Sequence, residues 1–311
     1  MKIGVVGAGA VGSFFGAMLE EGGNEVTFLA RGQHLRKMKE KGLTVKKEED
    51  TFTLQSSFTD QLKDLADSQL ILFCVKSHDT KQIAKELDQY ISKDSLIMTM
   101  QNGVDNEGKL MEIFGARRTF SCATYIQSAI TAPGIVQQDG RVTLVIGELI
   151  VDARETCAEI VQVFQKSGID AKHTSSILEK KWRKFLWNIT FNPLSAVSNA
   201  GIGDILDQKT LRRTAESVCR EAMEVAIQEG ISTDREKILD TMFKNAERAR
   251  GHRTSMLQDR LNNKQMEVEA MCGHVMRKAE EVDIPVPVIE TLYNILTFMN
   301  TQAALMQEVK K

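Results

Sequence analysis

A glycine-rich turn close to the N-terminus constrains this chain more than any other feature. A short apolar run at residues 3–6 and a helical pattern at residues 13–19 enclose the hexapeptide Gly7-Ala8-Gly9-Ala10-Val11-Gly12. A strand, a glycine turn and a helix in this order form the phosphate-binding start of a dinucleotide-binding βαβ unit. We therefore predict that all six residues of the turn bind a dinucleotide. The alternative is a glycine turn that serves packing alone.

The three glycines have separate expected tasks within this turn. Gly7 permits the tight bend, Gly9 has no Cβ to block a pyrophosphate, and Gly12 lets the helix lie close to the strand. The phosphates then meet N–H groups at the helix N-terminus, where the helix dipole favours negative charge.

The residue that follows the second predicted strand indicates which dinucleotide binds. Residues 25–29 read as a strand, and Arg31 comes about twenty residues after the glycine turn. An NAD-preferring enzyme commonly has Asp or Glu here, whereas Arg can hold the 2′-phosphate of NADP through paired N–H groups. His34, Arg36 and Lys37 add local positive charge. We predict NADPH, against the alternative of a solvated basic loop.

Two further predicted strands end in polar residues. The apolar run at residues 70–75 is followed by Lys76, and the run at residues 95–100 is followed by Gln101, Asn102 and Gly103. Residues beyond the carboxyl ends of parallel strands face the ligand crevice of a doubly wound sheet. Lys76 and Asn102 are therefore candidate cofactor contacts, and Asn102 is also a candidate substrate contact. An Asn-Gly turn without a ligand is the alternative for Asn102.

Composition excludes several classes of protein. The chain has 311 residues, of which 42% are apolar and 26% charged, and its net charge of −2 favours neither nucleic acid nor an anionic membrane as a partner. We find no apolar run of transmembrane length and expect a cytoplasmic protein. The five scattered cysteines lack metal-ligand spacing, so we expect neither disulfides nor a metal; they are Cys74, Cys122, Cys157, Cys219 and Cys272.

The pattern of apolar residues changes near Ser175. We expect an α/β, doubly wound Rossmann-type domain at residues 1–175, in which residues 119–147 carry three short β-type runs. An all-helical domain follows at residues 176–311. Its helices are expected near residues 177–190, 193–199, 208–229, 234–249, 252–263, 265–282 and 287–307.

One helical stretch of the second half carries polar residues at regular spacing. Lys184 and Asn188 are four residues apart, and Asn192 follows after four more, just before Pro193. Because Pro193 disfavours helix at the residue before it, Asn192 could instead be the N-cap of a new helix. An adjoining apolar face would partly desolvate Lys184, which lowers a lysine pKa and suits proton transfer near neutrality. The alternative is a solvated lysine.

The ordered set of motifs resembles the ketopantoate reductase (2-dehydropantoate 2-reductase) family from end to end. The similarity rests on the glycine turn, Ala30-Arg31-Gly32, Val75-Lys76, Gln101-Asn102-Gly103-Val104, Ile146-Gly147-Glu148, Lys181-Trp182-x-Lys184, Asn188, Asn192-Pro193-Leu194-Ser195-Ala196, Ser255-Met256-Leu257-Gln258-Asp259 and Glu267. The resemblance implies reduction of 2-dehydropantoate to (R)-pantoate with NADPH, on the route to coenzyme A. It also implies a helical domain of the 6-phosphogluconate dehydrogenase C-terminal type.

The resemblance also implies a role for each site residue. Lys184 would be the general acid, and Glu267 would orient it and contribute to the cofactor site. Ser255 would bind the substrate carboxylate, and Asn188 and Asn192 would hold substrate oxygens. Lys76 and Asn102 would bridge cofactor and substrate, and Arg31 would bind the 2′-phosphate.

The chain departs from the family pattern around Glu267, and this bears on the substrate. Met266 stands where Thr is usual, and Ala270-Met271-Cys272-Gly273 replaces a more typical Tyr-x-Asn-Gly. The expected partner is a small 2-oxo acid, and a homodimer is compatible with the sequence. Two alternatives stay open: a reductase or dehydrogenase of another small 2-oxo acid, and a non-catalytic NADPH-binding sensor.

Overall fold

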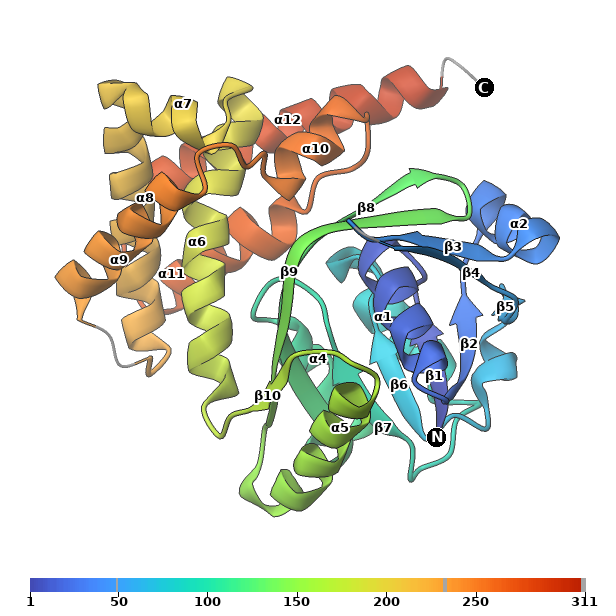
Figure 1. Ribbon diagram of the computed structural model, residues 1–311. Helices are drawn as coiled ribbons and strands as arrows, with labels where there is room; N and C mark the ends of the chain where they lie inside the picture. The colour runs from blue at the N-terminus through green and yellow to red at the C-terminus, as the bar shows by residue number, and fades with distance from the viewer. Residues whose placement is uncertain (49, 232–233, 309–311) are drawn as a thin grey trace. The chain divides into compact units, whose positions relative to one another are not determined.

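The computed structural model describes residues 1–48, 50–231 and 234–308. The chain divides into two compact units, Met1–Lys180 and Lys181–Lys311. The first unit contains a mixed β-sheet and helices, and the second is helical (Figure 1). The expected fold class, a Rossmann-type α/β domain followed by a helical domain, is confirmed.

The sheet of the first unit has the strand order β4-β3-β9-β8-β7-β6-β1-β2-β5, with β10 paired to β9. Strands β5, β2, β1, β6, β7 and β8 pair in parallel, as in a doubly wound fold. The strands are β1 (Lys2–Val6), β2 (Glu25–Leu29), β3 (Leu43–Lys46), β4 (Thr51–Leu54), β5 (Ser57–Thr59), β6 (Leu70–Phe73), β7 (Leu96–Thr99), β8 (Thr119–Ala132), β9 (Ile135–Glu148) and β10 (Ala171–His173).

Helices cover both faces of this sheet, which explains why its central strands are almost wholly apolar. One buried cluster joins the sheet to α1 (Ala10–Glu21), α2 (Gly32–Lys41) and α5 (Arg154–Lys166). A second cluster joins the opposite face to α3 (Thr80–Leu87) and α4 (Asn106–Phe114). Every residue of β6 is buried, so this strand anchors the middle of the sheet.

The region 119–147 differs from the expected three short strands. It forms two long antiparallel strands, β8 and β9, and the turn between them places Gly134 at a positive φ of 80°. Gly140, which separates the second and third of the expected runs in the sequence, lies inside β9, at an irregularity in its register with β8. A strand of this length is predicted poorly from local alternation, because bulges shift which side chains face the core.

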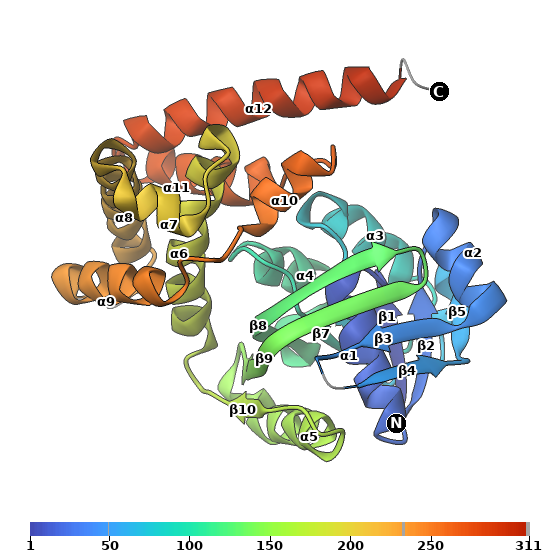
Figure 2. The same cartoon turned by 45° about the horizontal axis from the view of Figure 1, so that its top comes forward.

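Helix α6 (Ile177–Ser198) begins at the end of the first unit and lies mostly in the second. The second unit also contains α7 (Ile202–Asp207), α8 (Lys209–Gln228), α9 (Arg235–Arg248), α10 (Ser255–Leu261), α11 (His274–Glu281) and α12 (Pro287–Glu308). A π-helical turn, Glu269–Gly273, precedes α11. Helix α12 packs against α8 and this π-helical turn (Figure 2). Glu221 of α8 accepts the backbone N–H groups of Val288 and Ile289, at 3.0 and 2.9 Å, and so caps α12.

The expected helix break at Pro193 is wrong, since α6 continues through it. A proline inside a helix costs about 3 kcal/mol, because one hydrogen bond is lost. Phe191 and Leu194 on either side of Pro193 are buried, and burial of each such side chain contributes about 1.5–3 kcal/mol. Tertiary packing therefore outweighs the local preference.

Candidate active site

Four loops start at the same edge of the sheet in the first unit. Val6 of β1 pairs with Leu29 of β2 and with Phe73 of β6, and Phe73 pairs with Thr99 of β7. The pairs are parallel, so the segments that carry the glycine turn, Arg31, Lys76 and Asn102 all leave the sheet at its carboxyl edge. Ligands bind at this edge in doubly wound folds.

The glycine turn has the shape that close approach of a phosphate requires. Gly7 has a φ of 101°, which side chains other than glycine rarely adopt. A Cβ on Gly9 would meet no atom within 4 Å, and a Cβ on Gly12 would overlap the carbonyl oxygen of Gly7 and lie 2.9 Å from Val5. Space is therefore open at Gly9, on the ligand side, and closed at Gly12, on the sheet side.

The N-terminus of α1 is suited to an anion. The helix starts at Ala10 with Gly9 as its N-cap, and no side chain in the described part of the chain caps it. Its dipole and first N–H groups thus favour a phosphate. Ala8 is buried and donates its N–H to Leu29 at 2.8 Å, which fixes the turn to β2.

His34 supports this turn, a role that sequence reasoning missed. Its Nδ1 accepts the N–H of Gly134 at 2.9 Å, and its Nε2 lies 3.4 Å from Ser13 Oγ, which itself donates to the carbonyl of Ala8. Burial lowers the pKa of His34, so the neutral imidazole is favoured. The expected contribution of His34 to local positive charge is therefore corrected.

Arg31 stands directly after β2 and is the N-cap residue of α2. Its side chain is 87% exposed, and its Nη2 lies 3.4 Å from Asp79 Oδ2. An ion pair this exposed contributes about 0–1 kcal/mol, so the guanidinium can exchange the carboxylate for a stronger anion. A phosphate is such an anion, because it can accept two parallel N–H bonds.

A buried polar network joins the loops of Lys76 and Asn102. Gln101 Nε2 donates to the carbonyl of Val75 and to Thr80 Oγ1, both at 2.8 Å. Thr80 donates to Asn106 at 3.0 Å, and Asn106 Nδ2 donates to the carbonyl of Asn102 at 2.8 Å. Lys76 is exposed and Asn102 is half-buried. The network fixes the backbone beside both residues, and buried networks of this kind rigidify their surroundings.

In the second unit, α6 carries three predicted site residues in one row. Lys184 and Asn188 are half-buried, and Asn192 is 3% exposed. The spacing of four residues stacks the three side chains on one helical face, and the unbroken helix extends this row to Asn192. The alternative of Asn192 as an N-cap is therefore excluded.

The structure brings Asn192 and Ser255 together across 63 residues of sequence. Asn192 Nδ2 donates to Ser255 Oγ at 3.5 Å and lies 3.8 Å from Met271 Sδ. Ser255 is exposed and begins α10, whose N-cap Thr254 accepts the N–H of Leu257 at 3.3 Å. A rigid helix start thus holds the Ser255 hydroxyl beside the polar row of α6.

Glu267 does not lie on a helix, which corrects the expected helix at residues 265–282. It is half-buried and precedes the π-helical turn. Asn300 of α12 accepts the Met266 N–H at 3.0 Å and donates to the Met266 carbonyl at 3.1 Å, which satisfies this backbone without helical bonds. Asn300 was missed from the sequence, because no local signal marks a contact made 34 residues away.

The segment with Glu267 also packs against α6. The rings of Trp182 and Phe185, on either side of Lys184, lie 6.0 and 5.9 Å from the ring of His274. Glu269 receives a hydrogen bond from Tyr293 of α12 and one at 2.9 Å from Arg277. Glu267 therefore lies just before a π-helical turn and a helix, α11, of which the turn is bonded to α12 and α11 packs against α6.

Comparison with known proteins identifies the family. A model of the family described as ketopantoate reductase PanE/ApbA matches residues 3–150, and a model of its C-terminal part matches residues 176–300. The chain belongs to the ketopantoate reductase family. It is an oxidoreductase, and a nicotinamide dinucleotide is its cofactor, as the glycine turn indicated. No described helix of this reductase is long and apolar enough to cross a membrane.

Curated relatives and solved structures agree with this assignment. The reductase is 31% identical to a 2-dehydropantoate 2-reductase of Halobacterium salinarum, over 95% of this chain and 98% of the relative. It is 29% identical to the 2-dehydropantoate 2-reductase of Pyrococcus horikoshii, over 92% of this chain and 93% of that relative. A ketopantoate reductase from Ralstonia eutropha matches with a TM-score of 0.91 and 26% identity, over 98% and 100% of the two chains. A D-mandelate dehydrogenase bound to NADH matches with the same TM-score at 22% identity, which shows the fold alone.

Proposed function

We propose that this protein reduces 2-dehydropantoate to (R)-pantoate with NADPH, a step toward pantothenate and coenzyme A. The family assignment supports this, as do relatives that carry the name 2-dehydropantoate 2-reductase. The observation that carries the proposal is the contact between Asn192 and Ser255, because it unites two motifs to which the family resemblance gives substrate-binding roles.

The residues at the carboxyl edge of the sheet fit NADPH. The open space at Gly9 and the N-terminus of α1 suit the pyrophosphate, and Arg31 suits the 2′-phosphate. Lys76 and Asn102 stand on backbone that the buried network fixes, at the strand ends where the nicotinamide end of a dinucleotide is expected. When bound, NADPH supplies the hydride for the carbonyl carbon of the oxo acid.

Residues of the second unit supply the proton and hold the substrate in this proposal. Hydride addition places negative charge on the 2-oxo oxygen, and the Lys184 ammonium both stabilises this charge and donates the proton. Glu267 keeps Lys184 protonated and oriented. The hydroxyl of Ser255 binds the substrate carboxylate, and the amides of Asn188 and Asn192 bind substrate oxygens.

A second candidate is the reduction of another small 2-oxo acid by the same residues. The contact of Met271 Sδ with Asn192 favours it, because this apolar side chain borders an amide proposed to hold substrate oxygens. Met271 lies between Ala270 and Cys272, the two positions of this stretch that depart from the usual family pattern. A pocket with more apolar surface can favour an apolar substrate side chain over the hydroxyl-bearing chain of 2-dehydropantoate.

A panel of 2-oxo acids tests both candidates. Steady-state rates with 2-dehydropantoate, 2-oxoisovalerate, 2-oxoisocaproate and benzoylformate are measured with NADPH and with NADH. The proposal predicts the highest kcat/KM for 2-dehydropantoate with NADPH. A higher kcat/KM for an oxo acid without a hydroxyl supports the second candidate. NADPH binding without turnover of any compound contradicts both and supports a non-catalytic sensor.

A further inference from the structure

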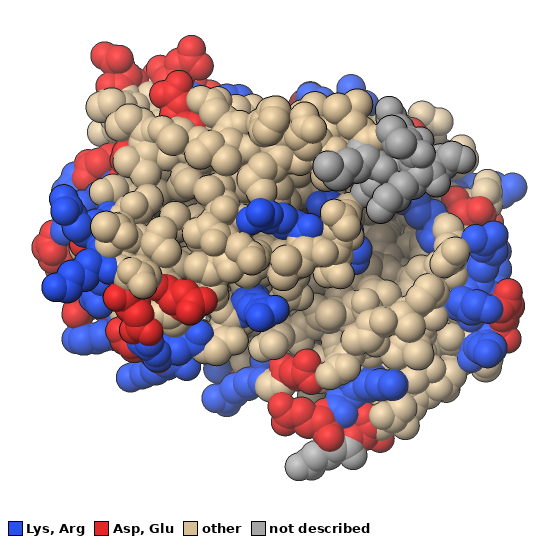
Figure 3. All heavy atoms as spheres, turned by 90° about the horizontal axis from the view of Figure 1, so that it is seen from above, with Lys and Arg blue, Asp and Glu red and all other residues tan. Residues whose placement is uncertain are grey.

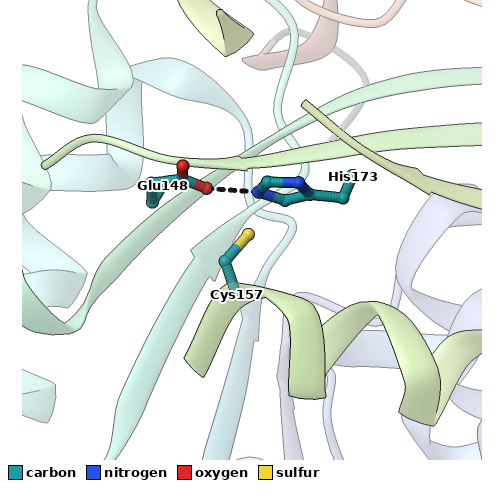
Figure 4. Close-up of side chains that lie close together, drawn as sticks. All are labelled: Glu148, Cys157 and His173. Atoms are coloured by element: carbon teal, nitrogen blue, oxygen red, sulfur yellow. Dashed lines mark hydrogen bonds and ion pairs between the residues drawn. The ribbon is translucent and has the colours of Figure 1, made fainter. Parts of the chain in front are cut away.

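Three side chains with metal-binding atoms meet in the first unit, away from the carboxyl edge that holds the proposed cofactor residues. They are Glu148, the last residue of β9, Cys157 of α5 and His173, the last residue of β10 (Figure 4). One carboxylate oxygen, the thiol sulfur and one ring nitrogen all lie within 4.8 Å of one another. We propose that these three residues bind a single Zn²⁺ ion or a similar divalent transition metal.

The donor atoms fit this class of ion. Zn²⁺ takes sulfur, imidazole nitrogen and carboxylate oxygen in tetrahedral sites, at about 2.0–2.3 Å, so that its ligand atoms lie about 3.3–3.8 Å apart. The three atoms lie within 4.8 Å of one another, so shifts of about 1 Å bring them to these separations. The distance from Glu148 Oε2 to His173 Nε2 is 2.6 Å, so this pair would separate by less than about 1.5 Å as the metal replaces their hydrogen bond.

The surrounding elements hold the three residues in place. His173 lies in β10, which pairs in parallel with β9, and its register partner is Ile146, two residues before Glu148. Cys157 comes from the helix between these strands and is fully buried. The His173 side chain is 27% exposed, whereas that of Glu148 is 6% exposed. Solvent therefore reaches the cluster from the histidine side, which gives a metal ion an entry path.

The protonation states of the three side chains determine how many protons metal binding releases. Burial, together with the nearby Glu148 charge, raises the pKa of Cys157 to about 12, so the metal-free site holds a thiol. Burial alone would raise the pKa of Glu148, but the hydrogen bond from His173 brings it below the ordinary value. Metal binding needs the Cys157 thiolate, so it releases the thiol proton to solvent, and an imidazole that binds through Nε2 carries its proton on Nδ1. A carboxylate and a thiolate then balance the double positive charge.

The spacing of the three residues along the chain gives no sequence signal for this site. The ligands are separated by eight and fifteen residues and lie on two strands and a helix. Short metal motifs place two ligands on one turn or helix, which is not the arrangement here. The cluster arises only when β10 pairs with β9.

Cobalt provides a direct test, because Co²⁺ replaces Zn²⁺ and its bond to a thiolate absorbs in the near ultraviolet. Metal-free full-length protein is titrated with CoCl₂, and Zn²⁺ stoichiometry is measured by equilibrium dialysis. We expect one metal per chain, a thiolate absorption band and about one proton released. Cys157→Ser should remove the band, and His173→Gln should weaken Co²⁺ binding at least tenfold. Cys219→Ser, which changes another buried thiol, should retain both.

Several results would overturn the proposal. They are the absence of a thiolate band in the wild type, a band that persists in folded Cys157→Ser protein, and equal affinity of wild type and His173→Gln. Thermal melting with ZnCl₂ gives an independent measure, since the metal should raise the melting midpoint of the wild type more than that of His173→Gln. His173 is partly exposed, so this variant tests the site even where Cys157→Ser does not fold.

Discussion

Gly9 and Gly12 lie in the same turn, yet alanine at the two positions should have opposite consequences. At Gly9 the backbone has φ −76° and ψ −163°, which alanine adopts without strain, and its Cβ would meet no protein atom. Gly9→Ala should therefore leave stability unchanged or raise it by about 0.4–1 kcal/mol, because alanine reduces the conformational entropy of the unfolded chain. The new methyl group would project from the side where the phosphates are proposed to bind.

The expected loss in Gly9→Ala is confined to cofactor binding. A hydrogen bond to a charged group contributes about 1.5–3 kcal/mol, so the loss of one N–H to phosphate bond weakens NADPH binding about 10- to 150-fold. At Gly12, the Cβ would overlap the Gly7 carbonyl oxygen and lie 2.9 Å from Val5 Cγ1. Gly12→Ala should therefore cost about 1–3 kcal/mol of stability, as overpacked sites do.

Two measurements separate these effects. Thermal melting reports stability, and the midpoint of Gly12→Ala should fall by about 2–12 °C while that of Gly9→Ala does not fall. Titration of NADPH, followed by the fluorescence of the reduced nicotinamide, reports the dissociation constant. Wild-type affinity for NADPH in folded Gly9→Ala protein would refute the assignment of the pyrophosphate to this turn.

Three further predictions follow from single contacts. Arg31→Ala should weaken NADPH binding much more than NADH binding, because only NADPH carries the 2′-phosphate. Lys41→Ala, which removes an exposed cation at the opposite end of α2, should not discriminate between the cofactors. Equal losses for both cofactors in Arg31→Ala would contradict the 2′-phosphate role. Asn300→Ala should lower the free energy of unfolding by about 1–3 kcal/mol, measured by thermal melting, because the Met266 backbone loses two hydrogen bonds. It should also lower kcat more than NADPH affinity, because Met266 adjoins Glu267. Asn294→Ala, which changes an exposed residue of the same helix, serves as the control. Burial lowers the pKa of His34, so the unfolded state binds this proton more readily than the folded state. The free energy of unfolding should therefore fall as the pH drops below about 6.5. Urea unfolding of His34→Gln at a series of pH values should show a smaller fall.

Local features were predictable from the sequence because short-range physics determines them. The glycine turn, the strands around it and the carboxyl-edge residues Arg31, Lys76 and Asn102 need only the rules for strands, turns and helix starts. The charge balance is also a property of the sequence alone. In Figure 3, Lys and Arg side chains lie among Asp and Glu side chains around the margin of the face shown, in keeping with the net charge of −2. The roles of the site residues stay predictions.

Features that depend on distant contacts could not be predicted. Helix α6 continues through Pro193 because buried neighbours outweigh the proline rule. The segment at Glu267 leaves the helical path because Asn300 bonds to its backbone. The six-residue helix α7 is too short for its apolar period to be recognised. For Glu267 the deciding partner, Asn300, lies more than 30 residues away in the sequence.

The central claim is that Lys184 donates the proton in NADPH-dependent reduction, and one variant tests it most directly. Lys184→Ala is compared with Arg183→Ala, which changes an exposed cation one residue earlier on α6. The account predicts that kcat for 2-dehydropantoate falls about 10²- to 10⁴-fold in Lys184→Ala, with an unchanged dissociation constant for NADPH, and that Arg183→Ala keeps wild-type turnover. Turnover by Lys184→Ala within a few-fold of the wild type would contradict it.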